Sequence, residues 1–149
     1  MQEIYQMEVE WLMLADAAQV VGAKLYLLGG GWDVLTVNRA FPVDQRCALA
    51  LSILVPWNET NKKHSFEVEI ISEDKATEQT QSLMKMGGQF EVGRPPGIRQ
   101  GQEQRFQLAV DMNLRLETPG IKTVIANIEG QQMRRLEFSV IASPAITKA

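Results

Sequence analysis

Hydrophobic and polar residues alternate with a period of two over several long stretches of this chain. The clearest stretch is 104–116, where apolar residues occupy every second position from Phe106 to Leu116 and most positions between them are polar. This pattern is typical of a strand with one buried and one solvated face. Similar alternation recurs at 49–55, 66–70 and 136–140, and no segment has a convincing helical period. The pattern therefore predicts an all-β protein.

Turn-forming residues separate the alternating segments. Pro56-Trp57-Asn58, Gly87-Gly88 and Pro119-Gly120 are examples of this punctuation. The one long polar stretch, 73–82, is assigned to a loop with room for a helical turn. About eight short strands without intervening helices favour one antiparallel β-sandwich over residues 1–149, with loose termini at 1–6 and 143–149. The expected strands are 7–16, 24–37, 47–55, 64–72, 84–92, 104–116, 121–129 and 132–142.

Composition narrows the environment and the partners. Cys47 is the one cysteine and His64 the one histidine, so the chain can form neither an internal disulfide nor a Cys/His zinc site by itself. A reducing, cytoplasmic location is expected. The net charge of −3 and the pI near 5.2 argue against nucleic acid as a partner. No apolar run is long enough for a membrane-spanning helix, so no membrane insertion is expected.

Three consecutive glycines, Gly29, Gly30 and Gly31, precede Trp32. A phosphate-binding loop would need a helix after the glycines, whereas the residues from Asp33 to Val37 continue as a strand and begin with a negative charge. The favoured interpretation is a structural bulge within one strand, in which the indole of Trp32 covers the strip that the glycines leave bare.

No catalytic or metal-binding constellation is predicted. Acyl transfer would require His64 as the base, with Ser65, Ser52, Ser72 or Cys47 as the nucleophile. His64 follows Asn61-Lys62-Lys63 at a strand entrance and is expected to be a solvated surface residue. Cys47 opens an apolar run and is expected to be buried and inert. The acidic residues show no dense metal-ligand spacing. The protein is therefore predicted not to be an enzyme and to need no cofactor.

The loop with the strongest resemblance to a binding site contains Arg94, Pro95, Pro96, Gly97 and Arg99. A proline pair favours the polyproline II conformation, which leaves backbone carbonyls free, and arginine offers a planar fork of donors to a partner. The alternative is a stiff crossover between the two sheets. Both interpretations remain open from the sequence.

Four segments resemble those of a family of small, uncharacterised bacterial proteins. They are LADAAQ (14–19), LYLLGGGW (25–32), VPWNE (55–59) and FEVGRPPG (90–97). The resemblance covers about residues 7 to 141 and implies a bacterial origin and a sandwich fold but no activity. The closing segment from Pro119-Gly120 through Glu129-Gly130 to Val140 resembles the closing hairpin of immunoglobulin-like sandwiches, although Ile121-Lys122 stands where such hairpins often carry an aromatic. An immunoglobulin-like or C2-like sandwich is expected.

The expected function is that of a non-catalytic structural or protein-protein interaction module, which binds another protein or itself. The alternative is a small-ligand-binding sandwich, or an enzyme whose site is shared across an oligomer. An exposed apolar patch or an open sheet edge would favour the module. A concave pocket with convergent polar groups would favour the ligand-binding alternative.

Overall fold

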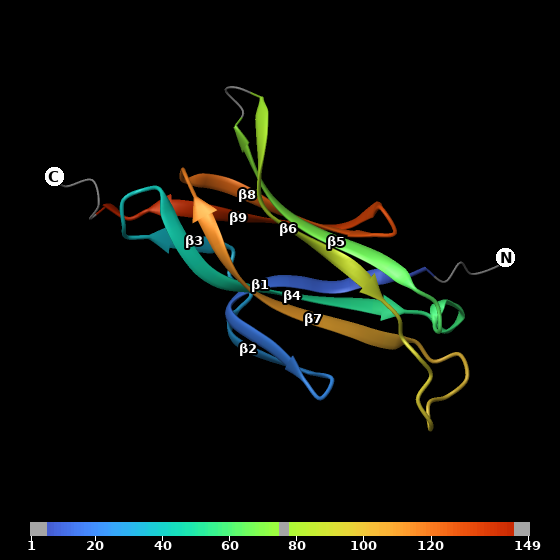
Figure 1. The fold of residues 1–149 in the computed structure, drawn as a ribbon. Helices are drawn as coiled ribbons and strands as arrows, with labels where there is room; N and C mark the ends of the chain where they lie inside the picture. The colour runs from blue at the N-terminus through green and yellow to red at the C-terminus, as the bar shows by residue number, and fades with distance from the viewer. Residues whose placement is uncertain (1–5, 75–77, 145–149) are drawn as a thin grey trace.

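The computed structural model describes residues 6–74 and 78–144, and these residues form two β-sheets packed face to face (Figure 1). Nine strands and one short 3-10 helix are present in the described residues. They are β1 (Glu8–Val21), β2 (Lys24–Gly30), β3 (Val34–Val37), β4 (Val43–Val55), η1 (Trp57–Glu59), β5 (His64–Asp74), β6 (Gln79–Phe90), β7 (Gln104–Leu116), β8 (Gly120–Ile128) and β9 (Gln131–Ala142). The predicted all-β sandwich is confirmed.

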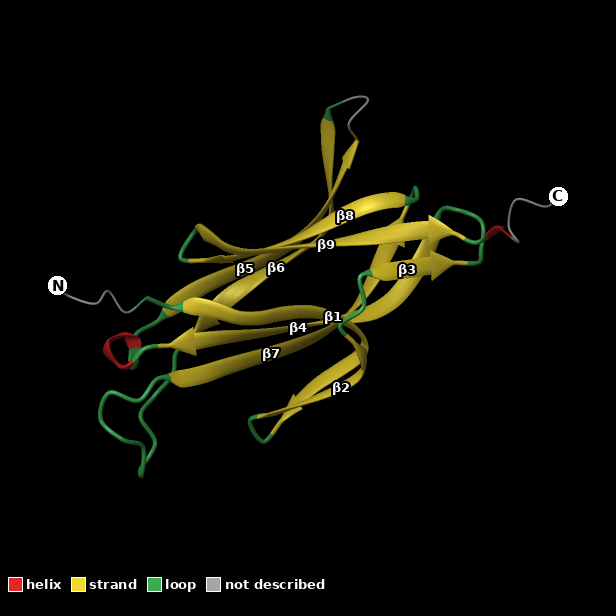
Figure 2. Ribbon diagram, turned by 180° about the vertical axis from the view of Figure 1, so that it is seen from behind, coloured by secondary structure: helices red, strands yellow, loops and turns green. Residues whose placement is uncertain are grey.

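The strand order is β2-β1-β4-β7 in one sheet and β3-β9-β8-β5-β6 in the other. Every second residue of β4 from Leu49 to Val55 faces the other sheet and is at most 1% exposed. On the other sheet Val68, Val124 and Phe138 belong to the same hydrophobic cluster. The alternation read from the sequence therefore builds the core between the sheets. In Figure 2, η1 and the loop before β7 lie at one end of the sandwich, and β3 lies toward the other.

The prediction of one strand over 24–37 with a glycine bulge is wrong. The chain leaves the first sheet after Gly30 and joins the second sheet as β3. Gly31 makes this change of sheet possible because its φ of +82° is unfavourable for residues with a side chain. Trp32 follows directly and packs edge-on against Phe138, with ring centroids 5.9 Å apart. The glycines therefore mark a crossover between sheets, and the sandwich has nine described strands rather than about eight.

The sandwich is also not antiparallel throughout. β3 pairs parallel with β9, in the register Val34↔Ser139 to Val37↔Ala142. A parallel neighbour is available here because β3 reaches the second sheet by a crossover and not by a hairpin. All other strand pairs are antiparallel.

A register shift near the start of β1 changes which residues face the core. The shift lies between Val9 and Trp11, where the pairing with β4 moves by one residue. Val9 is consequently buried in the core together with Leu12, while Glu10 turns outward and accepts a hydrogen bond from Ser52 Oγ at 3.1 Å. A bulge of this kind re-aims side chains without ending the strand.

The polar stretch 73–82 is not a loop with a helical turn. β5 continues to Asp74 and β6 begins at Gln79, so most of the stretch is paired strand, and 75–77 lie outside the described residues. The adjoining ends of β5 and β6 project from the body of the sandwich (Figure 1). The predicted loose termini also lie outside the described residues, except for Gln6, Ser143 and Pro144.

Candidate functional site

The hairpin formed by β1 and β2 separates from the sheet and folds back across its outer face. β1 pairs with β4 only as far as Ala15↔Ala48, although β1 itself continues to Val21. Gly29 lies at the bend with a φ of +59°, and a Cβ there would collide with the carboxylate of Asp16. Glycine is favoured at this bend by its backbone conformation, whereas the Asp16 carboxylate, at the end of an exposed flexible side chain, can move aside.

A second, smaller apolar cluster lies under the folded hairpin. Its buried members are four alanines: Ala15, Ala18, Ala48 and Ala50. Leu25 and Leu27 of β2 pack against them. Small side chains on the outer face of β4 permit this close approach, so β4 is covered on both faces. The tip of the hairpin is held by Gln107 of β7, whose Nε2 donates to the backbone oxygen of Ala23 at 3.0 Å.

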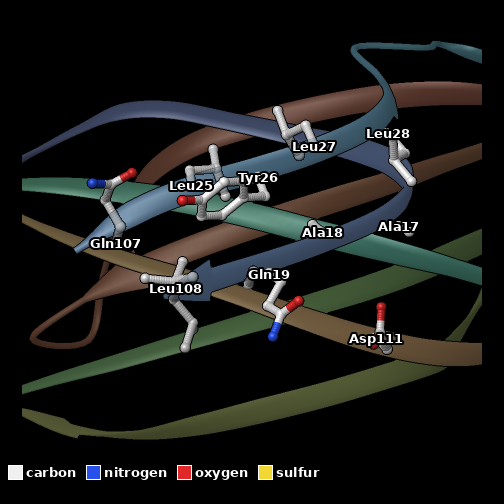
Figure 3. Close-up of a pocket in the computed structure, with 12 residues that line it drawn as sticks. Ala17, Ala18, Gln19, Leu25, Tyr26, Leu27, Leu28, Gln107, Leu108 and Asp111 are labelled. Carbon is white, nitrogen blue, oxygen red and sulfur yellow. The ribbon is translucent and has the colours of Figure 1, made fainter. Parts of the chain in front are cut away.

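A groove of about 1030 Å³ runs between this hairpin and β7 (Figure 3). We call it the hairpin groove. Its lining residues are Ala17, Ala18, Gln19, Val20, Leu25, Tyr26, Leu27, Leu28, Gln107, Leu108, Ala109 and Asp111. Tyr26 is 56% exposed and Leu28 is 71% exposed, so two large side chains of the lining face solvent. Asp111 is the one charged residue in the lining. Eight of the twelve lining residues are aliphatic, and Gln19, Tyr26, Gln107 and Asp111 contribute polar groups.

The loop predicted as a partner-binding site lies at the end of the sandwich beside η1. The guanidinium of Arg94 stacks over the ring of Trp57, 3.8 Å from its centroid. Arg94 Nε donates to Thr60 Oγ1 at 2.6 Å, and Nη2 donates to the backbone oxygen of Trp57 at 2.8 Å. These contacts engage Arg94 within the chain. Pro95, Pro96, Gly97 and Arg99 are exposed, and their role in binding remains a prediction.

Arg94→Lys is expected to lower the free energy of unfolding by about 1 kcal/mol, because lysine cannot make the stacked, forked contact with η1. Thermal melts of the variant and of the wild type measure this loss. Arg99→Lys is the matched control in the same loop, since no side-chain contact of Arg99 holds it to η1. An unchanged melting temperature together with weaker binding of a partner would contradict a structural role for Arg94.

His64 is buried and not a solvated surface residue, so that prediction is wrong. It is 5% exposed. Its Nδ1 lies 2.7 Å from Glu129 Oε1, and its Nε2 lies 2.7 Å from the backbone oxygen of Glu59. Both partners are acceptors, so both contacts are hydrogen bonds only when each ring nitrogen carries a proton. Sequence reasoning missed this because Glu129, in the β8–β9 turn, is distant along the chain.

The residues weighed for acyl transfer are not brought together as a nucleophile and a base. Ser65 Oγ donates to Glu129 Oε2 at 3.3 Å and not to the imidazole. Cys47 is 3% exposed, as predicted, and burial together with the nearby charge of Asp16 raises the pKa of its thiol to about 11. A thiol with this pKa is protonated at neutral pH and is a poor nucleophile.

Lys122 is a buried cation that the sequence analysis did not single out. It occupies an inward-facing position of β8, in phase with Val124, and is 3% exposed. Its Nζ donates to Ser72 Oγ at 2.9 Å, and no carboxylate of the described residues forms an ion pair with it. Burial lowers the pKa of this ammonium from its usual 10.5. The sequence does contain a sign of this, because Lys122 falls at an inward position of the alternating pattern that continues with Val124.

Lys122→Met is expected to raise the free energy of unfolding by about 1–2 kcal/mol at neutral pH, because it removes a poorly compensated buried charge and keeps the side-chain length. The pKa of Lys122 is lower in the folded state than its usual 10.5. The free-energy cost of burying the charged ammonium is therefore fully present below the folded-state pKa and disappears as the pH rises from that pKa toward 10.5. The advantage of the variant should therefore shrink in alkaline buffer. Urea denaturation at two pH values tests both points, and a less stable variant at neutral pH would refute the account.

The described part of the chain contains neither a metal-binding cluster nor a membrane-spanning helix. No group of three or more His, Cys, Asp or Glu side chains in residues 6–74 and 78–144 is arranged to hold a metal ion. Within the same residues no helix has the length and hydrophobicity required to span a membrane.

Comparison with known proteins identifies the family. The sequence model of a family of unknown function, DUF6941, matches residues 10–141. The chain belongs to this family. No curated protein matches the sequence.

Similar solved structures include the alkylpurine DNA glycosylase AlkC of Pseudomonas fluorescens, bound to DNA containing an abasic site analogue. The match has 13% identity and a TM-score of 0.49, and covers 91% of this chain and 30% of that one. A β-glucosidase of Listeria innocua in complex with isofagomine matches with 8% identity and a TM-score of 0.49, over 93% of this chain and 16% of that one. The chain thus spans less than a third of the length of these proteins.

Proposed function

We propose that this protein is a non-catalytic protein-protein interaction module that contacts its partner through the hairpin groove. The observation that supports this most strongly is the exposure of Leu28 and Tyr26 beside an apolar groove. Exposed leucine and tyrosine side chains next to a concave apolar surface are typical of a protein contact, because covering them releases ordered water and tyrosine contributes large contact area.

One feature of the groove favours a protein over a small molecule as its occupant. The groove lies open along the hairpin and does not enclose a cavity, whereas small-molecule sites bury most of the ligand's surface. A protein segment can cover such an extended surface with many weak contacts.

We further propose an immunoglobulin-like type for the sandwich. The order β1-β4-β7 corresponds to strands A, B and E of that fold, and the order β9-β8-β5-β6 corresponds to G, F, C and C′. The additional hairpin strand β2 is then an insertion after the first strand. A cytoplasmic location in a bacterium also remains part of the proposal, supported by the single buried Cys47.

Leu28→Ser is expected to abolish or strongly weaken co-purification of the native partner, while the free energy of unfolding changes by less than about 0.5 kcal/mol because the side chain is exposed. Affinity purification of the tagged protein from its source cells, with wild type and variant side by side, measures the first effect. Denaturant unfolding measures the second.

The matched control is Ile121→Ser, which removes a large apolar side chain of similar exposure, 57%, that lies outside the groove lining. Partner recovery with this control should equal that of the wild type. Equal recovery with Leu28→Ser would exclude this surface as the contact. If no protein co-purifies with either the wild type or the control, that result would count against an interaction module altogether.

A further inference from the structure

One backbone edge of β1 is paired over only part of its length. On one side β1 pairs with β2 as far as Val21↔Lys24, whereas on the other side its ladder with β4 ends at Ala15↔Ala48. From Ala17 to Val21 this second edge has no strand partner among the described residues. Its N–H and C=O groups are therefore free to pair with another chain.

This unpaired edge borders the hairpin groove. Ala17, Ala18 and Gln19 are lining residues, and Figure 3 shows the part of β1 that carries them between β2 and β7. Open backbone groups and an apolar hollow therefore occur at the same place. A lipid or a small aromatic ligand could fill the hollow but would leave the backbone groups without partners.

We propose that an extended segment of a partner protein pairs with the edge Ala17–Val21 as an added strand and fills the hairpin groove. The proposal rests on the proposed function and specifies the form of its partner. Only an extended chain offers alternating donors and acceptors at the spacing of a strand edge. The main chain of the segment supplies the hydrogen bonds, and every second side chain enters the groove.

The lining determines which side chains the segment carries. Ala17, Ala18 and Ala109 leave space for aliphatic side chains on the inward positions of the segment. Asp111 is exposed, and no described residue forms an ion pair or side-chain hydrogen bond with it. An aliphatic segment with one lysine or arginine opposite Asp111 matches this surface, because the basic group supplies the missing countercharge.

A second copy of this chain fits the edge less well. If two copies paired symmetrically at Ala17–Val21, each would bring its own Asp111 to the shared interface. Two carboxylates near one apolar interface repel each other, and neither copy places a basic residue in the groove lining. A different protein with a basic, extended segment is therefore the favoured occupant.

The test is selection of linear peptides from a random display library on the folded full-length protein, followed by titration of synthetic peptides. Selected peptides should be aliphatic with a basic residue. Asp111→Lys should weaken their binding about tenfold, because the attraction between Asp111 and the basic residue of the peptide becomes a repulsion between two positive charges. Glu91→Lys, a charge reversal at an exposed residue outside the groove, is the matched control and should leave affinity unchanged.

Two readouts distinguish strand addition from simple apolar docking. Hydrogen exchange of alternate amides within Ala17–Val21 should slow about tenfold or more when the peptide binds, because they become hydrogen-bonded. N-methylation of alternate peptide residues should weaken binding about fivefold or more per lost hydrogen bond, while methylation of the residues between them is tolerated.

The outcomes separate this inference from the proposed function. Peptides that bind equally to Asp111→Lys and leave these amides unprotected would overturn strand addition, and so would a library that yields no binder. A dimer that forms through this edge and is displaced by no peptide would overturn it as well. The interaction module itself is decided independently, by recovery of the native partner with Leu28→Ser and Ile121→Ser.

Discussion

Trp32→Ala is expected to lower the free energy of unfolding by about 2–3 kcal/mol, at or below the low end of the range for fully buried aromatic residues, because Trp32 is partly buried. Trp32 lies in the crossover between the two sheets and packs against the main hydrophobic cluster. Its edge contact with Phe138 joins the crossover to β9. Removing the indole therefore leaves a cavity where the chain changes sheet. The midpoint and slope of urea denaturation measure the loss.

Trp32→Phe is the informative companion variant. It keeps an aromatic ring beside Phe138 but removes the indole N–H, a buried donor that has no hydrogen-bond partner. Phenylalanine is smaller than tryptophan, so some packing energy is lost, but removing a buried donor without a partner also removes its desolvation cost. This variant should therefore be clearly more stable than Trp32→Ala. If Trp32→Ala cost less than about 0.5 kcal/mol, the indole would be free of the core and the crossover would depend on other contacts.

His64→Ala is expected to lower the free energy of unfolding by about 2–3 kcal/mol, because it breaks a buried hydrogen-bonded network. The ring joins the strand start of β5 to η1 through Glu59 and to the β8–β9 turn through Glu129. It also lies against Phe90, with ring centroids 5.4 Å apart. The neighbouring exposed Lys63→Ala is the control and should change stability by less than about 0.5 kcal/mol.

The cost of His64→Ala should depend on pH with a definite sign. The hydrogen bond with His64 holds the pKa of Glu129 below its ordinary value of 4.5. The stabilisation from this carboxylate is therefore present above pH 4.5 and is lost as the pH falls through the folded-state pKa. The difference between wild type and His64→Ala should narrow in acid. A difference that is constant or larger below pH 4.5 would show that Glu129 is not the partner that matters.

Much of the fold could be predicted from the sequence because it depends on local pattern. The strand predicted at 104–116 coincides with β7, and the inward residues of β4 form the core as their alternation indicated. Burial of Cys47 followed from its position at the start of an apolar run. Each of these inferences requires only the period of a strand and the preference of apolar side chains for the interior.

The candidate site was much less accessible to prediction. The sequence contains Gly29, Gly30 and Gly31 but does not say in which direction the chain turns, because glycine permits many backbone conformations at similar cost. The earlier interpretation of a bulge and the observed change of sheet use the same residues. The sequence likewise did not indicate that the guanidinium of Arg94 stacks on Trp57 and donates a hydrogen bond to Thr60, because these contacts join segments distant along the chain.

The sequence by itself determined that the protein is all-β, which residues alternate toward the core, and where most turns fall, since these depend on neighbours along the chain. Only the tertiary structure decided that the β1–β2 hairpin folds back over Ala48 and Ala50, that His64 is enclosed by Glu59 and Glu129, and that β1 keeps an open edge. These features depend on contacts between segments distant along the chain, and only the packed fold brings those segments together.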